Sequence, residues 1–167
     1  IQSSHEGRDI PLLISLPGKN GLLPVILFSH GLGGSRNGYN YVRTYWTGRG
    51  YATILLQHPG SDDSLLRGAS PSQALRQLRG ASTRKNMNLR VDDVTDVLDA
   101  MSVWTSDKKS PFYGRIDTNN VGMAGHSMGA KTAQLMIGQQ GWLSRTKKDK
   151  RIRAAVLMSP SSPSLQS

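Results

Sequence analysis

One short segment of the sequence combines the residue types and spacing of a serine nucleophile. Residues 125–129 read GHSMG, between an apolar run at 120–124 and a segment with helical patterning that starts at Met128. Where a buried strand turns at once into a helix, the residue in the turn adopts unusual backbone angles and its side chain stands at the carboxyl edge of the sheet. Ser127 is therefore a candidate for covalent catalysis. A strand, turn and helix with an incidental serine is the alternative interpretation.

A second glycine-rich segment is placed to supply hydrogen-bond donors to the same reaction. Residues 29–36 read SHGLGGSR and follow an apolar run at 24–29. Acyl transfer needs two backbone N–H groups directed at the developing oxyanion. We predict that Met128, which follows the serine, and Leu32 in this loop provide them. A flexible turn or a phosphate loop are the alternatives, whereas the dinucleotide pattern G-x-G-x-x-G is absent.

Several other residues are expected to shape this site without carrying the reaction. Glycine permits close approach of the backbone to a substrate, and a histidine in the loop can orient it by hydrogen bonding. His58 ends an apolar run at 51–57, so it could line the pocket or replace the usual base. The site-shaping residues predicted on these grounds are His30, Gly31, Gly33, His58 and His126.

A serine hydroxyl also needs a general base, normally histidine, and an acid that orients it. No histidine follows Ser127, and the only later acid is Asp149, which lies in a Lys/Arg cluster and is interpreted as a surface residue. His126 should pack beside the turn, and His5 should be exposed. After Ser127 the sequence therefore offers neither a histidine nor a buried acid.

The elements that must position these residues alternate along the chain. Helical spacing relates Val91, Val94, Leu98, Met101 and Trp104, whereas Asp92, Asp93, Asp96 and Asp99 lie off that stripe. The expected strands are 10–16, 24–29, 51–57, 120–124 and 152–158, and the expected helices are 41–48, 91–104 and 128–138. This order predicts an α/β fold, with a mostly parallel sheet and helices on both faces. We expect a single domain over 1–167, with a lid-like excursion at 61–84 and a loop after Met158.

Composition and charge exclude some classes of protein. Hydrophobic residues make up 37% and charged residues 19%, which is typical of neither a disordered nor a membrane protein, and no apolar run is long enough to span a bilayer. Cysteine is absent, so disulfides and thiolate metal sites are excluded. The first residue is Ile1 and not Met, which fits a processed secreted protein and fits a fragment equally well. The sequence does not fix the location, and we expect a secreted or periplasmic protein rather than a cytoplasmic one.

The net charge of +10 raises the possibility of nucleic-acid binding. The cations gather in two groups without interleaved aromatic residues, so we favour a solvated basic surface. The groups are Arg67, Arg76, Arg79, Arg84, Lys85 and Arg90, and Arg145, Lys147, Lys148, Lys150, Arg151 and Arg153.

Over residues 10–160 the chain resembles the dienelactone hydrolase and platelet-activating factor acetylhydrolase-like branch of the α/β-hydrolases. The motifs that carry the resemblance are HGLGG (30–34), GYATILLQHPGSD (50–62) and RIDTNNVGMAGHSMGA (115–130). GHSMG is also similar to the motif of bacterial cutinase-like polyesterases. The resemblance implies hydrolysis of small-molecule, lipid or polymer esters through an acyl-enzyme on Ser127, without metal or organic cofactor.

In this fold the acid and then the histidine follow the serine. Acetylhydrolase-like relatives can place the acid after the strand that follows the serine's helix, where this chain has Met158, Ser159 and Pro160. We therefore expect these 167 residues to be the N-terminal two-thirds of the fold, with acid and histidine supplied by a C-terminal segment, which could be a separate fragment. An α/β-hydrolase-like binding protein without turnover, or an inactive fragment, is the alternative.

Overall fold

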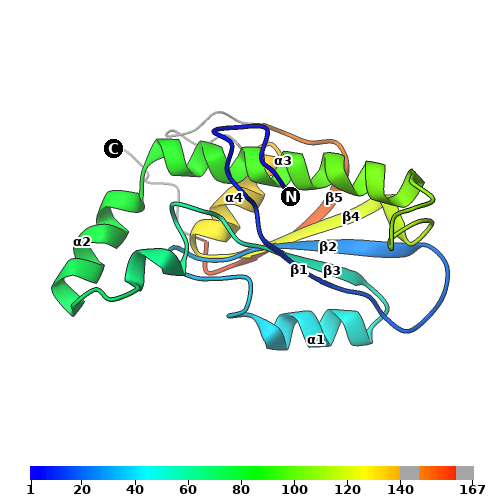
Figure 1. Ribbon diagram of the computed structural model, residues 1–167, viewed down its shortest axis with the longest axis horizontal. Coiled ribbons are helices and arrows are strands. Elements are labelled where there is room, and N and C mark those ends of the chain that lie inside the picture. Colours follow the sequence, from blue (N-terminus) through cyan, green and yellow to red (C-terminus); the bar gives the residue numbers. More distant parts are fainter. Residues whose placement is uncertain (140–146, 161–167) are drawn as a thin grey trace.

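A computed structural model describes residues 1–139 and 147–160 and shows a mixed five-stranded sheet between helices (Figure 1). The strand order is β1-β3-β2-β4-β5, with β1 antiparallel to β3 and every other pair parallel. The bounds are β1 Leu12–Ser15, β2 Leu23–Ser29, β3 Ala52–Leu56, β4 Ile116–His126 and β5 Ile152–Met158. The predicted mostly parallel sheet with helices on both faces is confirmed.

The helices cover the two faces unequally. α1 lies on one face of the sheet, and α3 and α4 lie on the other (Figure 1). The bounds are α1 Asn40–Gly48, α2 Pro71–Ala81, α3 Arg84–Ser106 and α4 Met128–Met136, with a short 3₁₀ helix, η1, at Asp63–Leu66. The larger core lies under α3 and α4 and includes Leu27, Ile54 and Met123 from the sheet.

The strands form where the sequence has continuous apolar runs. β3 is buried at all five positions, as expected for a strand inside the sheet that is covered on both faces. β4 is longer than predicted and begins at Ile116, because its polar first half still pairs with β2 at Leu23 and Pro24 before the register shifts at Val25. The runs thus located the strands but did not show how far a partly exposed strand extends.

The prediction for residues 61–84 is incomplete, because this segment contains a regular helix. Ser70 caps α2 by accepting a hydrogen bond from the Gln73 N–H, and the Gln73 side chain accepts one from the Ser70 N–H. This capping box, with Pro71 at the first turn, is a sequence signal for a helix start. α2 projects beyond the end of the sheet, away from β1 (Figure 1).

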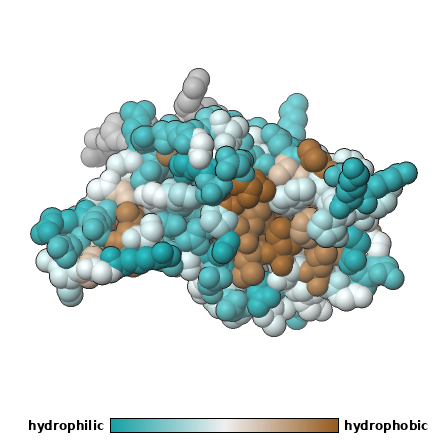
Figure 2. All heavy atoms as spheres, viewed as in Figure 1, coloured by the Kyte–Doolittle hydropathy of each residue, from teal (hydrophilic) through white to brown (hydrophobic). Residues whose placement is uncertain are grey.

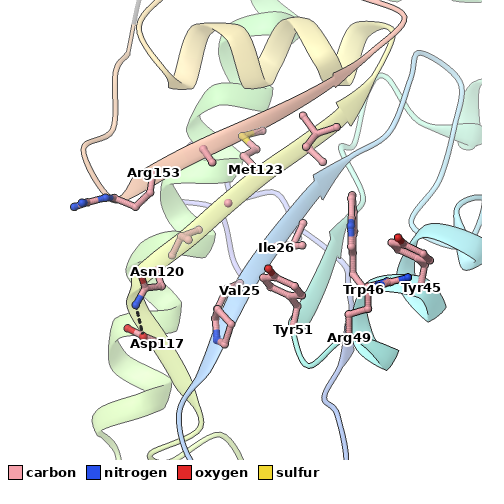
Figure 3. A pocket seen from close by; sticks show the side chains of 16 residues that line it. Val25, Ile26, Tyr45, Trp46, Arg49, Tyr51, Asp117, Asn120, Met123 and Arg153 are labelled. Atoms are coloured by element: carbon pink, nitrogen blue, oxygen red, sulfur yellow. Dashed lines mark hydrogen bonds between the residues drawn. The ribbon is translucent and has the colours of Figure 1, made fainter.

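The exposed surface is mostly polar over α2 and has a larger apolar area over β1 (Figure 2). Leu12, Leu13 and Ile14 of this edge strand are each only partly buried. On the face that carries α1, an open groove of about 690 Å³ extends over β4 and β5, with Trp46 and Tyr51 on one side and Arg153 on the other (Figure 3). The sheet is therefore covered on this face only over part of its width.

Two sequence expectations lie partly outside the described residues. The loop after Met158 is described only to Pro160, and Arg145 of the second basic group lies in the range 140–146 that the structure does not describe. Within the described part of the chain, no helix has both the length and the apolar character that a membrane crossing requires.

Candidate active site

Ser127 occupies a sharp turn between the end of β4 and the start of α4. Its backbone angles are φ 51° and ψ −114°, a region that residues with a side chain rarely adopt. Two hydrogen bonds hold this conformation: the Ser127 N–H donates to the Met158 carbonyl oxygen (2.9 Å), and the Lys131 N–H donates to the Ser127 carbonyl oxygen (3.1 Å). The turn is thus fixed by β5 on one side and by α4 on the other.

The two glycines of the GHSMG segment lie where no side chain fits. A Cβ atom on Gly125 would overlap the carbonyl group of Gly129, and a Cβ atom on Gly129 would overlap the carbonyl oxygen of Ser29 at the end of β2. Both obstacles are backbone atoms, which cannot move aside as a flexible side chain can. The glycines therefore allow α4 to start directly against β2.

The predicted donor residues lie around one cavity beside Ser127. This cavity, of about 380 Å³, is lined by Leu32, Ser82, Thr83, Arg84, Met87, Ser127, Met128 and Lys131. Gly31 is also close, because a Cβ atom on it would lie 3.5 Å from Ser127 Cβ. Within residues 1–139 and 147–160 neither the Leu32 nor the Met128 N–H donates a hydrogen bond, so both amides are available to a ligand.

Gly33 and His126 support the loop from two sides. Gly33 has φ 71°, and its N–H donates to the Ser61 carbonyl oxygen (2.9 Å). The Tyr39 hydroxyl lies 3.0 Å from His126 Nδ1 and accepts a long hydrogen bond from the Gly31 N–H (3.4 Å). His126 therefore packs beside the turn, as its position predicts.

Beneath the loop lies a buried arginine that sequence reasoning placed on the surface. Arg90 is 1% exposed, and its guanidinium donates to the His30 carbonyl oxygen (2.6 Å), Ser61 Oγ (2.8 Å) and the Gly31 carbonyl oxygen (3.4 Å). Burial lowers the pKa of Arg90 to about 10, which still leaves it charged at neutral pH. Its planar fork binds several oxygens at once, which an ammonium could not do in the same geometry.

A second buried chain of contacts joins β2, the end of β3 and α3. His58 Nδ1 lies 2.9 Å from Asp93 Oδ2, and His58 Nε2 lies 2.9 Å from Ser29 Oγ. Arg8 donates to the other Asp93 oxygen at 2.6 Å and to the Pro59 carbonyl oxygen at 2.9 Å. The order serine, histidine, aspartate is that of a catalytic triad, but Ser29, His58 and Asp93 are each 0% exposed. A substrate cannot reach Ser29 in this arrangement.

The expectation that His58 could line the pocket or act as a base is therefore not met in this structure. Both its ring nitrogens are engaged in the buried chain, and it is not in the lining of the cavity beside Ser127. His58 instead supports the loop from below, since its backbone N–H donates to His30 Nε2 (3.1 Å). The prediction that Asp93 lies off the buried face of its helix is likewise wrong, because Asp93 is 0% exposed and its carboxylate contacts His58.

His30 is held as a neutral ring that orients the loop. Its Nε2 accepts the His58 N–H, so the proton lies on Nδ1, which donates to the Gly31 carbonyl oxygen (2.7 Å). Burial, aided by the nearby His58 and Arg90, lowers the pKa of His30 to about 3. Burial, with Arg90 and Arg8, also holds the pKa of His58 well below its ordinary range. The loop-orienting role predicted for His30 has this geometric support.

These pKa values predict that acid destabilises the fold. A histidine titrates near 6.5 when unfolded, so below that pH the unfolded chain binds protons that His30 and His58 do not. Burial raises the pKa of Asp93 to about 7, which acts in the opposite direction between about pH 4 and 7. Below pH 6 the unfolded chain binds two protons on these histidines, and the folded chain binds one on Asp93. The unfolded chain therefore binds about one more proton than the folded chain, and the free energy of unfolding falls by roughly 1.4 kcal/mol per pH unit.

Urea unfolding at pH 7.5, 6 and 5 would measure this slope. The variant His30→Asn should show a smaller loss between pH 6 and 5 than the wild type, because one of the two groups is gone. A free energy of unfolding that rises on acidification would contradict the assignment of neutral buried histidines.

No base contacts the candidate nucleophile in the described part of the chain. Ser127 Oγ has no side-chain hydrogen-bond partner there, and His5 lies at a partly exposed site, 3.7 Å from Asp92. Asp149 is half-buried and pairs with Arg151 (2.6 Å), which lowers the pKa of this carboxyl. The expectation that a C-terminal segment supplies the acid and the base stays a prediction.

Comparison with known proteins identifies solved structures that resemble this one. The sequence matches no known family model and no curated protein. Its structure is similar to that of a ferulic acid esterase from Streptomyces cinnamoneus (TM-score 0.58, 24% identity), over 81% of this chain and 36% of the esterase. It is also similar to a dienelactone hydrolase from Anabaena variabilis (TM-score 0.52, 20% identity), over 84% of this chain and 56% of that one.

A third similar structure is a cold-adapted esterase from an Arctic intertidal metagenomic library (TM-score 0.57, 18% identity), over 93% of this chain and 56% of the esterase. The chain thus has the α/β-hydrolase fold, as its motifs predict, and a dienelactone hydrolase is among the structures it resembles. It spans between about a third and just over half of the length of these three proteins.

Proposed function

We propose that this chain carries the nucleophile half of a serine ester hydrolase. The observation that carries the proposal is the position of Ser127, in a strained turn beside a cavity that Leu32 and Met128 also line. In this proposal the turn is a nucleophile elbow, and the Leu32 and Met128 N–H groups form the oxyanion hole. The esterases and the hydrolase of similar structure support the assignment.

The proposed reaction runs through an acyl-enzyme. A base takes the proton of Ser127 Oγ as this oxygen attacks the ester carbonyl carbon, and the negative charge of the tetrahedral intermediate lies on the carbonyl oxygen. The intermediate collapses, and the alcohol leaves with the proton. Water then attacks the acyl-enzyme by the same route and releases the acid and the free serine. No step calls on a metal or an organic cofactor.

The base and its acid are proposed to come from polypeptide other than the described residues, most simply a C-terminal segment that completes one α/β-hydrolase domain. The uncovered groove over β4 and β5 and the partial coverage of the similar structures support this proposal. The secreted or periplasmic location stays a prediction.

An intact-mass measurement after incubation with a fluorophosphonate probe tests the proposal. One adduct that maps to Ser127 is expected wherever a base is supplied, because only an activated serine reacts at a useful rate. An adduct at another residue, or none on a chain that includes the C-terminal segment, would contradict the assignment of Ser127.

The second candidate is an α/β-hydrolase-like binding protein that does not turn over its ligand. The observation that favours it is the lack of a partner for Ser127 Oγ within the described residues. It predicts ester binding in the cavity without a fluorophosphonate adduct.

Nucleic-acid binding has less support, because several cations of the two basic groups are buried or paired with a carboxylate. Arg90 is buried, Lys147 pairs with Asp92 (2.6 Å), and Arg151 pairs with Asp99 (2.6 Å).

A further inference from the structure

The cavity beside Ser127 has an unusual charge for a site that would take a neutral ester. Its two ionisable side chains, apart from the serine, are the cations Lys131 and Arg84, and no Asp or Glu lines it among the described residues. Leu32, Met87 and Met128 supply an apolar wall. A ligand that fits this lining combines a short apolar part with a negative charge.

Lys131 is the cation placed closest in sequence to the reacting atom. It lies on α4 four residues after Ser127, and its N–H binds the Ser127 carbonyl oxygen. Its side chain is half-buried and forms no ion pair within residues 1–139 and 147–160. By contrast, the partly buried Arg8 and Arg151 each have a carboxylate partner at 2.6 Å.

Local helix electrostatics do not explain a lysine at this position. The first turn of a helix favours acidic side chains, because the free N–H groups there carry partial positive charge. The first turn of α4 contains no acid, so Lys131 adds a cation to an end that is already positive. A residue that opposes its local preference without a partner is the kind that function retains.

We propose that Lys131 binds a carboxylate of the substrate, so that the cavity selects esters of short dicarboxylic acids in which one carboxyl group is free. This inference rests on the proposed function, because it assigns the substrate class of the same site. The volume of about 380 Å³ lies near the lower end of the range for small-molecule sites, which favours a short acyl chain. The free carboxylate meets Lys131 while the ester carbonyl lies at Ser127.

Binding, measured without turnover, tests the inference independently of catalysis. Monomethyl succinate is titrated into Ser127→Ala protein that carries ¹³C-methyl methionine, and the methyl resonances of Met87 and Met128, which line the cavity, are followed. We expect saturable shifts that weaken about 10- to 100-fold in a second variant with Lys131→Met, from the loss of one charge-assisted hydrogen bond. Lys131→Arg should retain most of the affinity.

Two controls separate the charge from the fold. Lys109→Met removes a cation from the exposed turn after α3 and should leave the titration unchanged. Methyl 4-methylpentanoate, in which an uncharged branched group replaces the carboxylate, should bind equally to proteins with and without Lys131. Circular dichroism confirms that each variant is folded.

The outcomes distinguish this inference from the proposed function. Monomethyl succinate binding that is unaffected by Lys131→Met, or no binding at all to a folded chain, overturns the inference whether or not Ser127 is reactive. Binding that depends on Lys131, together with no fluorophosphonate adduct on a chain that includes the C-terminal segment, upholds the ligand class and contradicts catalysis. With an active protein, kcat/KM for the hemisuccinate ester should exceed that for its neutral isostere, and Lys131→Met should remove the difference.

Discussion

Replacing Ser127 with alanine is expected to abolish the fluorophosphonate adduct and to reduce ester hydrolysis by about 10³-fold or more, because only oxyanion stabilisation and binding would remain. The fold should persist, since the turn is held by the Met158 and Lys131 backbone contacts and not by the serine hydroxyl. Hydrolysis of p-nitrophenyl acetate and intact mass after probe treatment measure the two effects.

Ser159 offers a matched control for this variant. It also has a positive φ (48°), and it follows β5 at the same edge of the sheet. Ser159→Ala should retain the adduct and hydrolyse the ester within about twofold of the wild type, in line with the small effect of most surface substitutions. Unchanged hydrolysis in Ser127→Ala, or an adduct that maps to Ser29 of the buried chain, would refute the role assigned to Ser127.

Replacing Gly129 with alanine is expected to cause the largest loss of stability of any glycine-to-alanine change among the glycines that the structure describes. The added Cβ would overlap the carbonyl oxygen of Ser29, so α4 would have to move away from β2. Overpacking against atoms that can relax costs about 1–3 kcal/mol, and this obstacle is backbone, so we expect about 3 kcal/mol or more. Urea unfolding monitored by circular dichroism measures the change.

Gly80 provides the control, because it lies inside α2 and a Cβ atom there would meet nothing within 4 Å. Gly80→Ala should stabilise the protein by up to about 1 kcal/mol, since alanine loses less backbone entropy in a helix. Equal stability of Gly129→Ala and wild type would show that α4 can move away from β2 at little cost.

Much of the fold could be predicted from the sequence because three of its strands coincide with mainly apolar runs. The runs at 24–29 and 51–57 correspond to β2 and β3, and the run at 152–158 corresponds to β5. The same criterion missed the polar first half of β4, whose pairing depends on a neighbouring strand. It also missed α2, whose start is marked by the capping box of Ser70 and Gln73.

The candidate site was predictable where local geometry determines it and not where distant segments meet. Ser127, Leu32 and Met128 belong to motifs whose spacing implies a turn and a loop, and the structure places all three around one cavity. Arg90 and Asp93 were placed at the surface because their charge suggested solvent. Each lies four residues before a core residue, Val94 and Val97 respectively, so helical spacing did contain a signal of burial.

The attachment of Arg8 beneath the site also affects how the chain should respond to proteases. Trypsin cleaves after arginine only when it can take the side chain into its own specificity pocket. The Arg8 side chain is 14% exposed, and its guanidinium is bound to Asp93 and to the Pro59 carbonyl oxygen. The bond between Arg8 and Asp9 is thus shielded while these contacts are intact. Its cleavage rate would report how often the contacts of Arg8 with Asp93 and Pro59 break.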